Sequence, residues 1–352
     1  MSDQKLVNHI KELKSILKEK VIIPVHHYQH PDIVQFADII GDSYKLAVEA
    51  AKTTSGFILF CGVMFMAESA SILANQNQTV LIPEPHAGCP MAEMADISLV
   101  KSAFEMIKDN VSKDIVPVVY MNSYADLKSF CGENDGSVCT SSNAEIILDY
   151  YFKQGKKVLF FPDYYLGKNT GNKMNLKESE FAIIRKNSKI ESSGSLSDAK
   201  IFLWDGFCPV HQRFTIGDIT YLRKKYPSIK IIVHPECKEE IVDASDLSGS
   251  TEKIYNLIKE SPAGSVWGIG TETTFVERLA EENTNKTILP LKSSVCKNMI
   301  KITLPKLARS LESIINYIEK DQKLLHEVRV NDKYKAGAKE SLQRMIDIVE
   351  KR

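Results

Sequence analysis

Short apolar runs rich in β-branched residues recur along the chain, and most are followed by apolar residues at helical spacing. Such runs cover residues 21–25, 56–60, 79–83, 116–120, 157–161, 201–204, 230–233, 265–268 and 287–290. Runs of four or five such residues are typical of strands buried on both faces of a parallel sheet. The pattern therefore predicts an α/β fold.

Helical periodicity is clearest at the two ends of the chain. The first twenty residues have an amphipathic pattern, and residues 304–318 place six Leu and Ile residues on one face, before a charged last helix from Lys335. Between the strands we expect further helices, over 36–40, from Ser43 to Ala51 and from Phe65. The terminal helices read as packing elements.

Three of the apolar runs lead through a short turn to a cysteine. Residues 79–89 read TVLIPEPHAGC, residues 201–208 read IFLWDGFC, and residues 287–296 read TILPLKSSVC. Loops at the carboxyl ends of parallel strands build the functional site in such sheets. Cys89, Cys208 and Cys296 are therefore expected on equivalent loops that can converge on one point.

The order of these features repeats three times, which predicts three pseudo-threefold-related α/β/α units, each with a short four-stranded parallel sheet. From the polar residue that ends the first strand to the cysteine is 63 residues (26 to 89), 86 residues (122 to 208) and 62 residues (234 to 296). The surplus in the middle copy lies in a polar stretch, 167–200, expected at the surface. We place the units at 1–112, 113–228 and 229–321, followed by a helical tail at 322–352. The alternative is one doubly wound sheet of about twelve strands, a length uncommon for open sheets.

Composition narrows the function classes. The 45 basic residues balance 45 acidic ones, which disfavours nucleic acid or an anionic membrane as a partner. No apolar run approaches the roughly 18 residues needed to cross a bilayer, and the charged start MSDQKLVNHIKELK lacks the apolar region of a signal peptide. We expect a cytoplasmic location.

The seven cysteines do not form a sequence-local motif. There is no CxxC, so a metal site would have to be assembled by the fold. Cys61 and Cys237 read as small buried apolar residues, and Cys131 and Cys139 could form a disulfide or have no role. Three thiolates at a central junction suit zinc or an iron–sulfur cubane. A [4Fe-4S] cluster held by three cysteines has one open iron, which favours dehydration or condensation over electron transfer.

Each unit also presents polar side chains near its cysteine. After the first strand stand the pairs His26 and Tyr28, Tyr120 and Asn122, and His234 and Glu236, each at i, i+2 spacing and so able to face the same way. The helix starts carry Ser43, Ser141, Ser250 and Thr251. These hydroxyl residues are ordinary N-caps, and helix starts also bind carboxylates and phosphates.

At these residues the chain resembles the quinolinate synthase family over most of its length, from Val21 to Leu311. The resemblance is carried by the motifs HHYQHPDIVQFADIIGDSYKLA (26–47), FCGVMFMAESA (60–70), AGCPMA (87–92), YMNSYADLK (120–128), CTSSNA (139–144), GFCPVH (206–211), HPEC (234–237), SGST (248–251), GTET (270–273) and CKNMIKITLPKL (296–307).

The resemblance implies a [4Fe-4S] cluster at the central junction, with Cys89, Cys208 and Cys296 as its ligands. It implies condensation of iminoaspartate with dihydroxyacetone phosphate to quinolinate, with release of phosphate and two waters, and a functional link to an enzyme that supplies iminoaspartate. By the same resemblance the catalytic residues are Glu236, Tyr28, His26 and His234. The substrate-binding residues are Ser43, Tyr120, Asn122, Ser141, Ser250 and Thr251.

Two departures from the family pattern limit what is carried over. Met64 stands where the family commonly has a histidine, and Cys296 is followed by Lys-Asn-Met without the extra cysteines of some bacterial members. Redox control by a local disulfide is therefore not expected. Two other readings stay open: an iron–sulfur hydro-lyase acting on another small hydroxy acid, and a non-enzymatic iron–sulfur sensor, which the absence of a DNA-binding segment disfavours.

Overall fold

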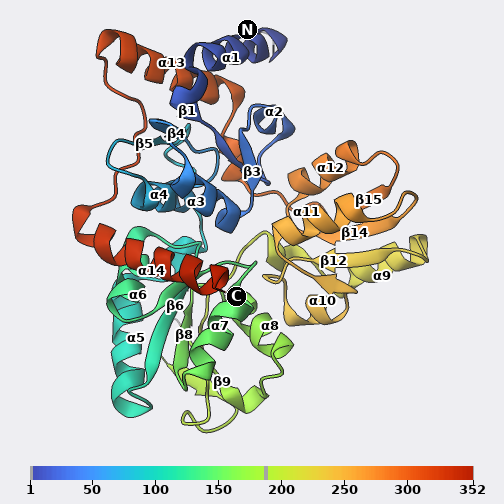
Figure 1. The fold of residues 1–352 in the computed structure, drawn as a ribbon. Coiled ribbons are helices and arrows are strands. Elements are labelled where there is room, and N and C mark those ends of the chain that lie inside the picture. The colour runs from blue at the N-terminus through green and yellow to red at the C-terminus, as the bar shows by residue number, and fades with distance from the viewer. Residues whose placement is uncertain (1–2, 186–188, 352) are drawn as a thin grey trace.

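The computed structural model describes residues 3–185 and 189–351. Three parts of the predicted segments lie outside the described residues: residues 1–2 of the first unit, residues 186–188 of the polar surface stretch, and residue 352 of the tail. In the described part the chain forms several small, mostly parallel sheets covered by helices (Figure 1). A single continuous sheet is thus wrong, because the strands divide into four separate hydrogen-bonded sets.

The first group of elements forms a three-stranded sheet, β1-β4-β5, and beside it a two-stranded sheet, β2-β3. The two are joined by a bridge between Val25 and Cys61. In chain order the group contains α1 (Asp3–Leu17), η1 (Lys18–Lys20), β1 (Val21–Ile22), β2 (Pro24–His26), α2 (Pro31–Val34), β3 (Ile39–Gly41), α3 (Ser43–Lys52), β4 (Phe57–Leu59), α4 (Met64–Leu73) and β5 (Thr79–Leu81).

Asp38 explains why the predicted strand 21–25 is divided and why the predicted helix 36–40 is wrong. The Ile23 N–H donates to Asp38 Oδ2 at 2.8 Å, and the Asp38 N–H donates to the Ile23 carbonyl at 3.0 Å. Ile23, which lies between β1 and β2, therefore bonds to Asp38 and not to a neighbouring strand. The β-branched Ile39 and Ile40 then pair with β2, so this stretch becomes strand β3.

The second group forms a six-stranded sheet in the order β10-β9-β11-β8-β6-β7, in which β10 runs antiparallel to β9. The predicted four strands are an undercount here, because the polar stretch 167–200 contributes β9 and β10 to the sheet edge. The elements are η2 (Ala92–Met94), α5 (Ile97–Asn110), β6 (Ile115–Tyr120), α6 (Ala125–Glu133), β7 (Ser137–Cys139), α7 (Ala144–Lys153), β8 (Lys157–Phe161), α8 (Tyr164–Lys173), η3 (Glu178–Glu180), β9 (Phe181–Ile184), β10 (Ile190–Ser192) and β11 (Ile201–Trp204).

The third group forms a four-stranded parallel sheet, β13-β12-β14-β15, as predicted. Its elements are η4 (His211–Arg213), α9 (Ile216–Lys225), β12 (Lys230–Val233), α10 (Glu239–Asp243), β13 (Leu247–Ser248), α11 (Thr251–Glu260), β14 (Val266–Gly270), α12 (Thr273–Glu282) and β15 (Thr287–Pro290). The sequence did not locate β3, β7 and β13, which are short strands of two or three residues outside the apolar runs that predicted the other strands of these sheets.

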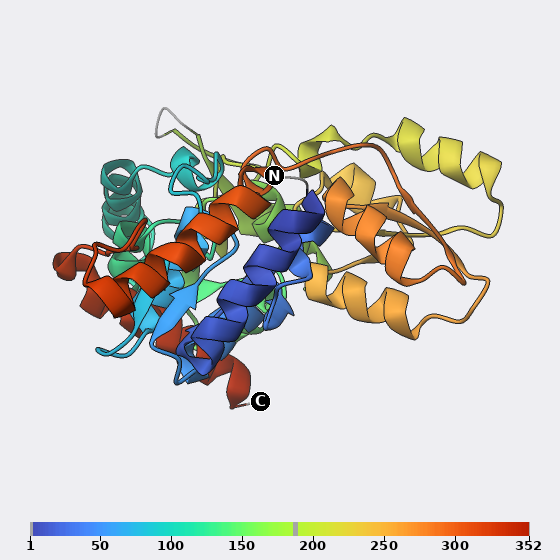
Figure 2. The same ribbon diagram turned by 90° about the horizontal axis from the view of Figure 1, so that it is seen from above.

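The chain ends in η5 (Met299–Lys301), α13 (Leu304–Lys320) and α14 (Asp332–Glu350). Helix α13 returns to the first group and packs beside α1, as Figure 2 shows. Helix α14 packs on α6 and also contacts α4, so it joins the first and second groups. At the α14–α6 contact, a Cβ added to Gly132 would lie 1.9 Å from the Gly337 carbonyl oxygen, so this close approach requires glycine.

Most strand residues are buried, which leaves the loops at their carboxyl ends to form the site. The β6, β8 and β11 segments contribute to one large core cluster, and the third group has two smaller clusters on either side of its sheet. Within the described residues, no helix has the length and apolar character needed to span a membrane.

Candidate active site

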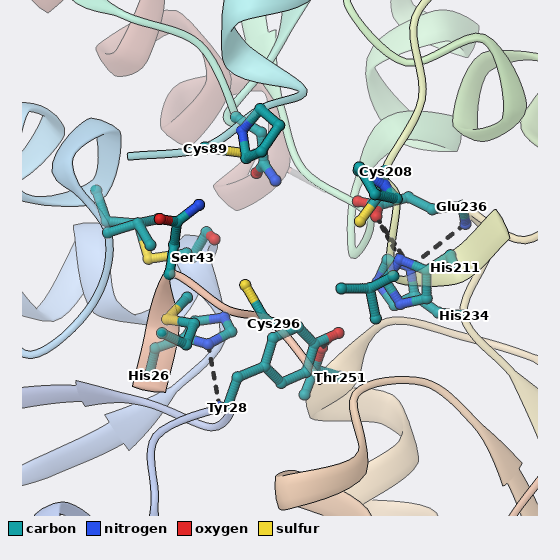
Figure 3. A pocket seen from close by; sticks show the side chains of 18 of the residues that line it. His26, Tyr28, Ser43, Cys89, Cys208, His211, His234, Glu236, Thr251 and Cys296 are labelled. Atoms are coloured by element: carbon teal, nitrogen blue, oxygen red, sulfur yellow. Dashed lines mark hydrogen bonds and ion pairs between the residues drawn. The ribbon is translucent and has the colours of Figure 1, made fainter. Parts of the chain in front are cut away.

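A cavity of about 330 Å³ lies where loops of all three groups meet (Figure 3). All but one of the predicted site residues line it. They are His26, Tyr28, Ser43, Cys89, Tyr120, Asn122, Ser141, Cys208, His234, Glu236, Thr251 and Cys296.

Ser250 is the exception. Its hydroxyl caps α11 by accepting the Lys253 N–H at 3.3 Å, and the residue lines a neighbouring polar cavity of about 140 Å³ that shares Ser141 with the first. Ser250 therefore has the ordinary N-cap position that the sequence also indicated.

The three predicted ligand cysteines have the same local structure. Each is followed by a 3-10 turn that begins three residues later, at Ala92, His211 and Met299, and the N–H of that residue lowers the pKa of the cysteine. Figure 3 shows the three sulfur atoms directed toward the same open space. Backbone N–H groups aimed at a sulfur stabilise its thiolate form.

These thiols also influence one another. Burial raises the pKa of Cys89; with the opposing effect of the Ala92 N–H and the added effect of the neighbouring Cys296, the pKa is about 12. The pKa of Cys208 is raised by burial, then by Glu236, Cys89 and Cys296. Without a cation the sulfurs would be protonated, and metal binding would displace those protons.

The donor set fits an iron–sulfur cluster. Three half-buried thiols face one cavity, each with an N–H donor beside its sulfur, and thiolates are the ligands that iron–sulfur clusters and zinc prefer. Cys61, Cys131, Cys139 and Cys237 are buried and do not line this cavity. Atoms of Cys208, His211 and Glu236 also lie within 4.8 Å of one another, so potential metal-binding groups continue beyond the thiols.

Glu236 is the ionised centre of the site. Its Oε1 accepts the Tyr120 hydroxyl at 2.5 Å, and its Oε2 lies 2.7 Å from His211 Nδ1. Burial alone would raise the pKa of Glu236, but the charge of His234, which is protonated at the low pH where Glu236 titrates, the adjacent His211 and the Tyr120 hydrogen bond outweigh it and lower the pKa to about 2. A carboxylate held in this way can accept a proton only from a strong neighbouring acid, or after its hydrogen bonds rearrange.

The two predicted catalytic histidines are neutral and share one tautomer. His26 Nδ1 accepts the Tyr28 N–H at 3.2 Å, and His234 Nδ1 accepts the Glu236 N–H at 3.3 Å. Burial lowers the pKa of each to about 3. A neutral ring whose Nδ1 is an acceptor carries its proton on Nε2. Each histidine is therefore a hydrogen-bond donor through Nε2, and His234 Nε2 lies 3.2 Å from the Ser141 hydroxyl.

Tyr28 joins the first and third groups at the cavity. Its hydroxyl lies 2.8 Å from Thr271 Oγ1 and accepts the Thr251 hydroxyl at 3.2 Å. Burial raises the pKa of Tyr28 well above its usual value, and the charge of Glu236 raises it further. Tyr28 is therefore a neutral phenol that can donate a proton.

The hydroxyl residues lie at helix starts, as predicted. Ser43 is the first residue of α3 and Thr251 the first residue of α11, while Ser141 precedes α7. Asn122 Oδ1 is buried without a hydrogen-bond partner among the described residues, and so is the hydroxyl of Thr140, which also lines the cavity. Buried polar groups are normally satisfied, so these atoms are available to a ligand.

Sequence reasoning missed several cavity residues. His211 stacks on His234 with ring centroids 4.5 Å apart, and its Nε2 lies 3.1 Å from Thr271 Oγ1. Arg213 and Lys297 are exposed cations that line the cavity, and Asp42 also lines it. Of these residues, only His211 had a signal in the sequence, because it follows the predicted ligand Cys208 by three residues.

The comparisons with known proteins cover most of the chain and all name quinolinate synthase. The family model for the quinolinate synthetase A protein matches residues 8–347. The chain is 41% identical to the quinolinate synthase of Bacillus cytotoxicus over 92% of this chain and 90% of that protein. It is 41% identical to that of Corynebacterium glutamicum (99% and 89%) and 40% identical to that of Listeria innocua (99% and 95%). The chain belongs to the quinolinate synthase A family.

Proposed function

We propose that this cavity is a quinolinate synthase active site, in which iminoaspartate and dihydroxyacetone phosphate are condensed to quinolinate, phosphate and two waters. The observation that carries the proposal is the meeting of three half-buried cysteines with the Tyr120–Glu236–His211 group on one cavity. Family membership supports the same activity.

The finer fold proposal is a pseudo-threefold arrangement of units 1–112, 113–228 and 229–321. Two turns support it: Ile231 donates to Asp246 Oδ2 at 2.7 Å and accepts the Asp246 N–H at 3.0 Å, as Ile23 does with Asp38. In both cases the aspartate follows the isoleucine by 15 residues. The strand orders β7-β6-β8-β11 and β13-β12-β14-β15 are also equivalent.

Cys89, Cys208 and Cys296 would hold a [4Fe-4S] cluster at the centre of this arrangement. When bound, such a cluster has one iron without a protein thiolate, which acts as a Lewis acid toward a hydroxyl or carboxylate oxygen. A cluster of this kind is stable in a reducing compartment, consistent with the expected cytoplasmic location.

The overall reaction defines what the residues must do. A carbon–carbon bond forms between the two substrates, the carbon–oxygen bond to phosphate breaks, and the nitrogen of iminoaspartate, in its enamine form, condenses with a carbonyl of the triose. Closing the aromatic ring also requires isomerisation of a keto intermediate and loss of two waters. Each of these steps moves protons, so neutral donors and a carboxylate base must stand side by side.

The side chains of the cavity supply these roles. Glu236 accepts protons during isomerisation and dehydration, with Tyr28 as the neutral acid beside Thr251. The Nε2–H groups of His26 and His234 donate to substrate carbonyl or carboxylate oxygens. Ser43, Ser141 and Thr251 at helix starts, together with Asn122, bind the carboxylates and phosphate; Ser250 supports the α11 start.

Product analysis tests the proposal. Anaerobically reconstituted protein is supplied with iminoaspartate, made in place by an aspartate-oxidising enzyme, and dihydroxyacetone phosphate, and quinolinate is measured by mass spectrometry. We expect quinolinate and phosphate in equal amounts. Iron-loaded protein that forms no quinolinate, but dehydrates another hydroxy acid, would support the hydro-lyase alternative instead.

A further inference from the structure

The segment Gly270–Thr273 runs from the last residue of β14 to the first residue of α12; it lies outside the cavity lining but contacts several residues and loops of the site. Thr271 and Glu272 are fully buried, and Thr273 is nearly so. A charged side chain is almost never fully buried unless its oxygens are bonded. The contacts of Glu272 therefore indicate what it is buried for.

Glu272 connects the start of α12 to the third cysteine loop. Its Oε2 accepts the Phe275 N–H at 3.1 Å, which caps the helix. Its Oε1 accepts the Cys296 N–H at 3.1 Å and the Thr274 hydroxyl at 3.2 Å. Capping needs only one of the two oxygens, so the second is committed to the backbone of the cysteine.

Thr273 makes a second connection to the same loop. The Ser294 N–H donates to Thr273 Oγ1 at 2.6 Å, and the Thr273 N–H donates to the Ser294 carbonyl at 3.0 Å. The buried Ser294 hydroxyl in turn donates to the Val210 carbonyl at 2.7 Å, two residues after Cys208. Two of the three cysteine loops are thus joined through this segment.

Thr271 connects the same segment to the acid and base groups. Its hydroxyl lies 2.8 Å from the Tyr28 hydroxyl and 3.1 Å from His211 Nε2. Three consecutive side chains therefore contact the Tyr28 phenol, the His211 imidazole and the Cys296 loop.

The first group has no such connection. Helix α4 begins after Val63, which offers no side-chain acceptor, and the Met64 N–H donates instead to the Ala87 carbonyl at 2.7 Å. An α/β unit of this kind can therefore place a cysteine loop without a buried carboxylate. The second group has an equivalent side chain: Asp163 is fully buried and caps α8 by accepting the Leu166 N–H at 2.7 Å.

We propose that Glu272 is a positioning residue, which fixes the Cys296 loop for cluster binding and, through its neighbour Thr271, keeps that loop in register with Tyr28 and His211. The proposal rests on the cluster site proposed above. In the metal-free protein, Glu272 already accepts the Cys296 N–H, before any cluster binds.

Two substitutions separate this role from helix capping. Glu272→Asp keeps a strong N-cap residue but is one methylene too short to reach the Cys296 N–H as well. Glu272→Ala removes both contacts. Glu277→Ala is the control, because Glu277 is an exposed carboxylate on the same helix.

The first measurement uses metal-free protein. Hydrogen–deuterium exchange of peptides covering residues 292–300 should accelerate roughly tenfold in both Glu272 variants and stay unchanged in Glu277→Ala, because the Cys296 N–H loses its hydrogen-bond acceptor. Thermal unfolding identifies a variant that does not fold; Thr273→Ala then replaces it, with the same expected result. Unchanged exchange in a folded Glu272→Asp protein would overturn the proposal.

The second measurement uses anaerobically reconstituted protein. Iron loss to a chelator, followed by absorbance, should be roughly tenfold to hundredfold faster in Glu272→Asp than in the wild type, with no change in Glu277→Ala. Wild-type rates of iron loss in Glu272→Asp would also overturn the proposal. Neither measurement depends on turnover, so a protein that binds iron but forms no quinolinate would refute the proposed function and leave this inference standing.

Discussion

Tyr120 donates its phenolic hydrogen to Glu236 across 116 positions of sequence, at a distance of 2.5 Å. The bond joins the carboxyl end of β6 to the loop after β12, and so joins the second group to the third. The Tyr120 hydroxyl contacts Oε1 of Glu236, and His211 Nδ1 lies beside Oε2, so both carboxylate oxygens have partners.

Replacing Tyr120 with Phe should lower turnover while leaving the fold intact. The change removes one hydrogen bond to a charged group, worth about 1.5 to 3 kcal/mol, or roughly tenfold to hundredfold in rate. Steady-state kinetics on reconstituted protein measures it. Tyr221→Phe, at a tyrosine that is 62% exposed, is the matched control; equal kcat values in the two variants would remove Tyr120 from the mechanism.

Glu236→Gln should retain four irons and lose turnover by at least roughly a hundredfold, the usual contribution of a general base. The amide keeps the size of the side chain but cannot take up a proton. Iron and sulfide counts establish that the cluster is present. Wild-type rates in this variant would refute its role in proton transfer.

Cys208→Ala should give a folded chain that does not retain four irons after anaerobic reconstitution. Only two cysteine thiolates then remain, so two of the four irons of a [4Fe-4S] cluster would lack a protein ligand. Cys61→Ala, at a buried thiol that does not line the cavity, should load iron like the wild type. Full loading of Cys208→Ala would contradict the ligand assignment.

Arg213 and Lys297 should speed the capture of anionic substrates. Both cations line the cavity. The cavity lining also includes the acidic residues Asp42 and Glu236, so the two cations offset negative charge near the substrates. In Arg213→Gln and Lys297→Gln we expect kcat/KM to fall several-fold and its dependence on ionic strength to weaken, with kcat little changed. Lys292→Gln is the control, because Lys292 is exposed and does not line the cavity. An equal salt dependence in all variants would argue against steering.

Glu252 should make the stability of the fold depend on acid pH. It contacts His27 at 2.9 Å and Lys45 at 3.1 Å, which links the first and third groups. Burial would raise the pKa of Glu252, but the hydrogen bonds from His27 and Lys45 outweigh it and lower the pKa from 4.5 to about 2. A depressed carboxylate pKa adds stability above the unfolded value, and that stability is lost as pH falls from 4.5 toward 2.

Urea unfolding at a series of pH values tests this link. Because Glu252 is partly exposed, we expect solvent screening to reduce its contribution to about 1 to 2 kcal/mol. Wild type and Glu252→Gln should differ by this amount at pH 6 and converge below pH 3. A constant difference across the range would show that the ion pair is not the cause. Glu260→Gln, at an exposed carboxylate on the same helix, is the control.

Much of the element order follows from local pattern. The strands 157–161, 201–204, 230–233 and 287–290 were predicted with their observed limits, because each is an apolar run between polar turns. The predicted helix at 36–40 failed where Asp38 closes a turn onto Ile23 and frees the next residues to pair as β3. A side-chain bond of that kind leaves no periodic signal.

The sequence by itself determined the α/β class, the three cysteines at strand ends and the polar pairs that precede them. Each depends on residues that are neighbours along the chain, so the pattern of apolar and polar positions carries the information. Only the tertiary structure decided that Glu236 lies between Tyr120 and His211, that Ser250 lines the neighbouring cavity, and that Glu272 binds the Cys296 amide. These contacts join loops of different sheets, and their geometry depends on how the groups pack rather than on any local spacing.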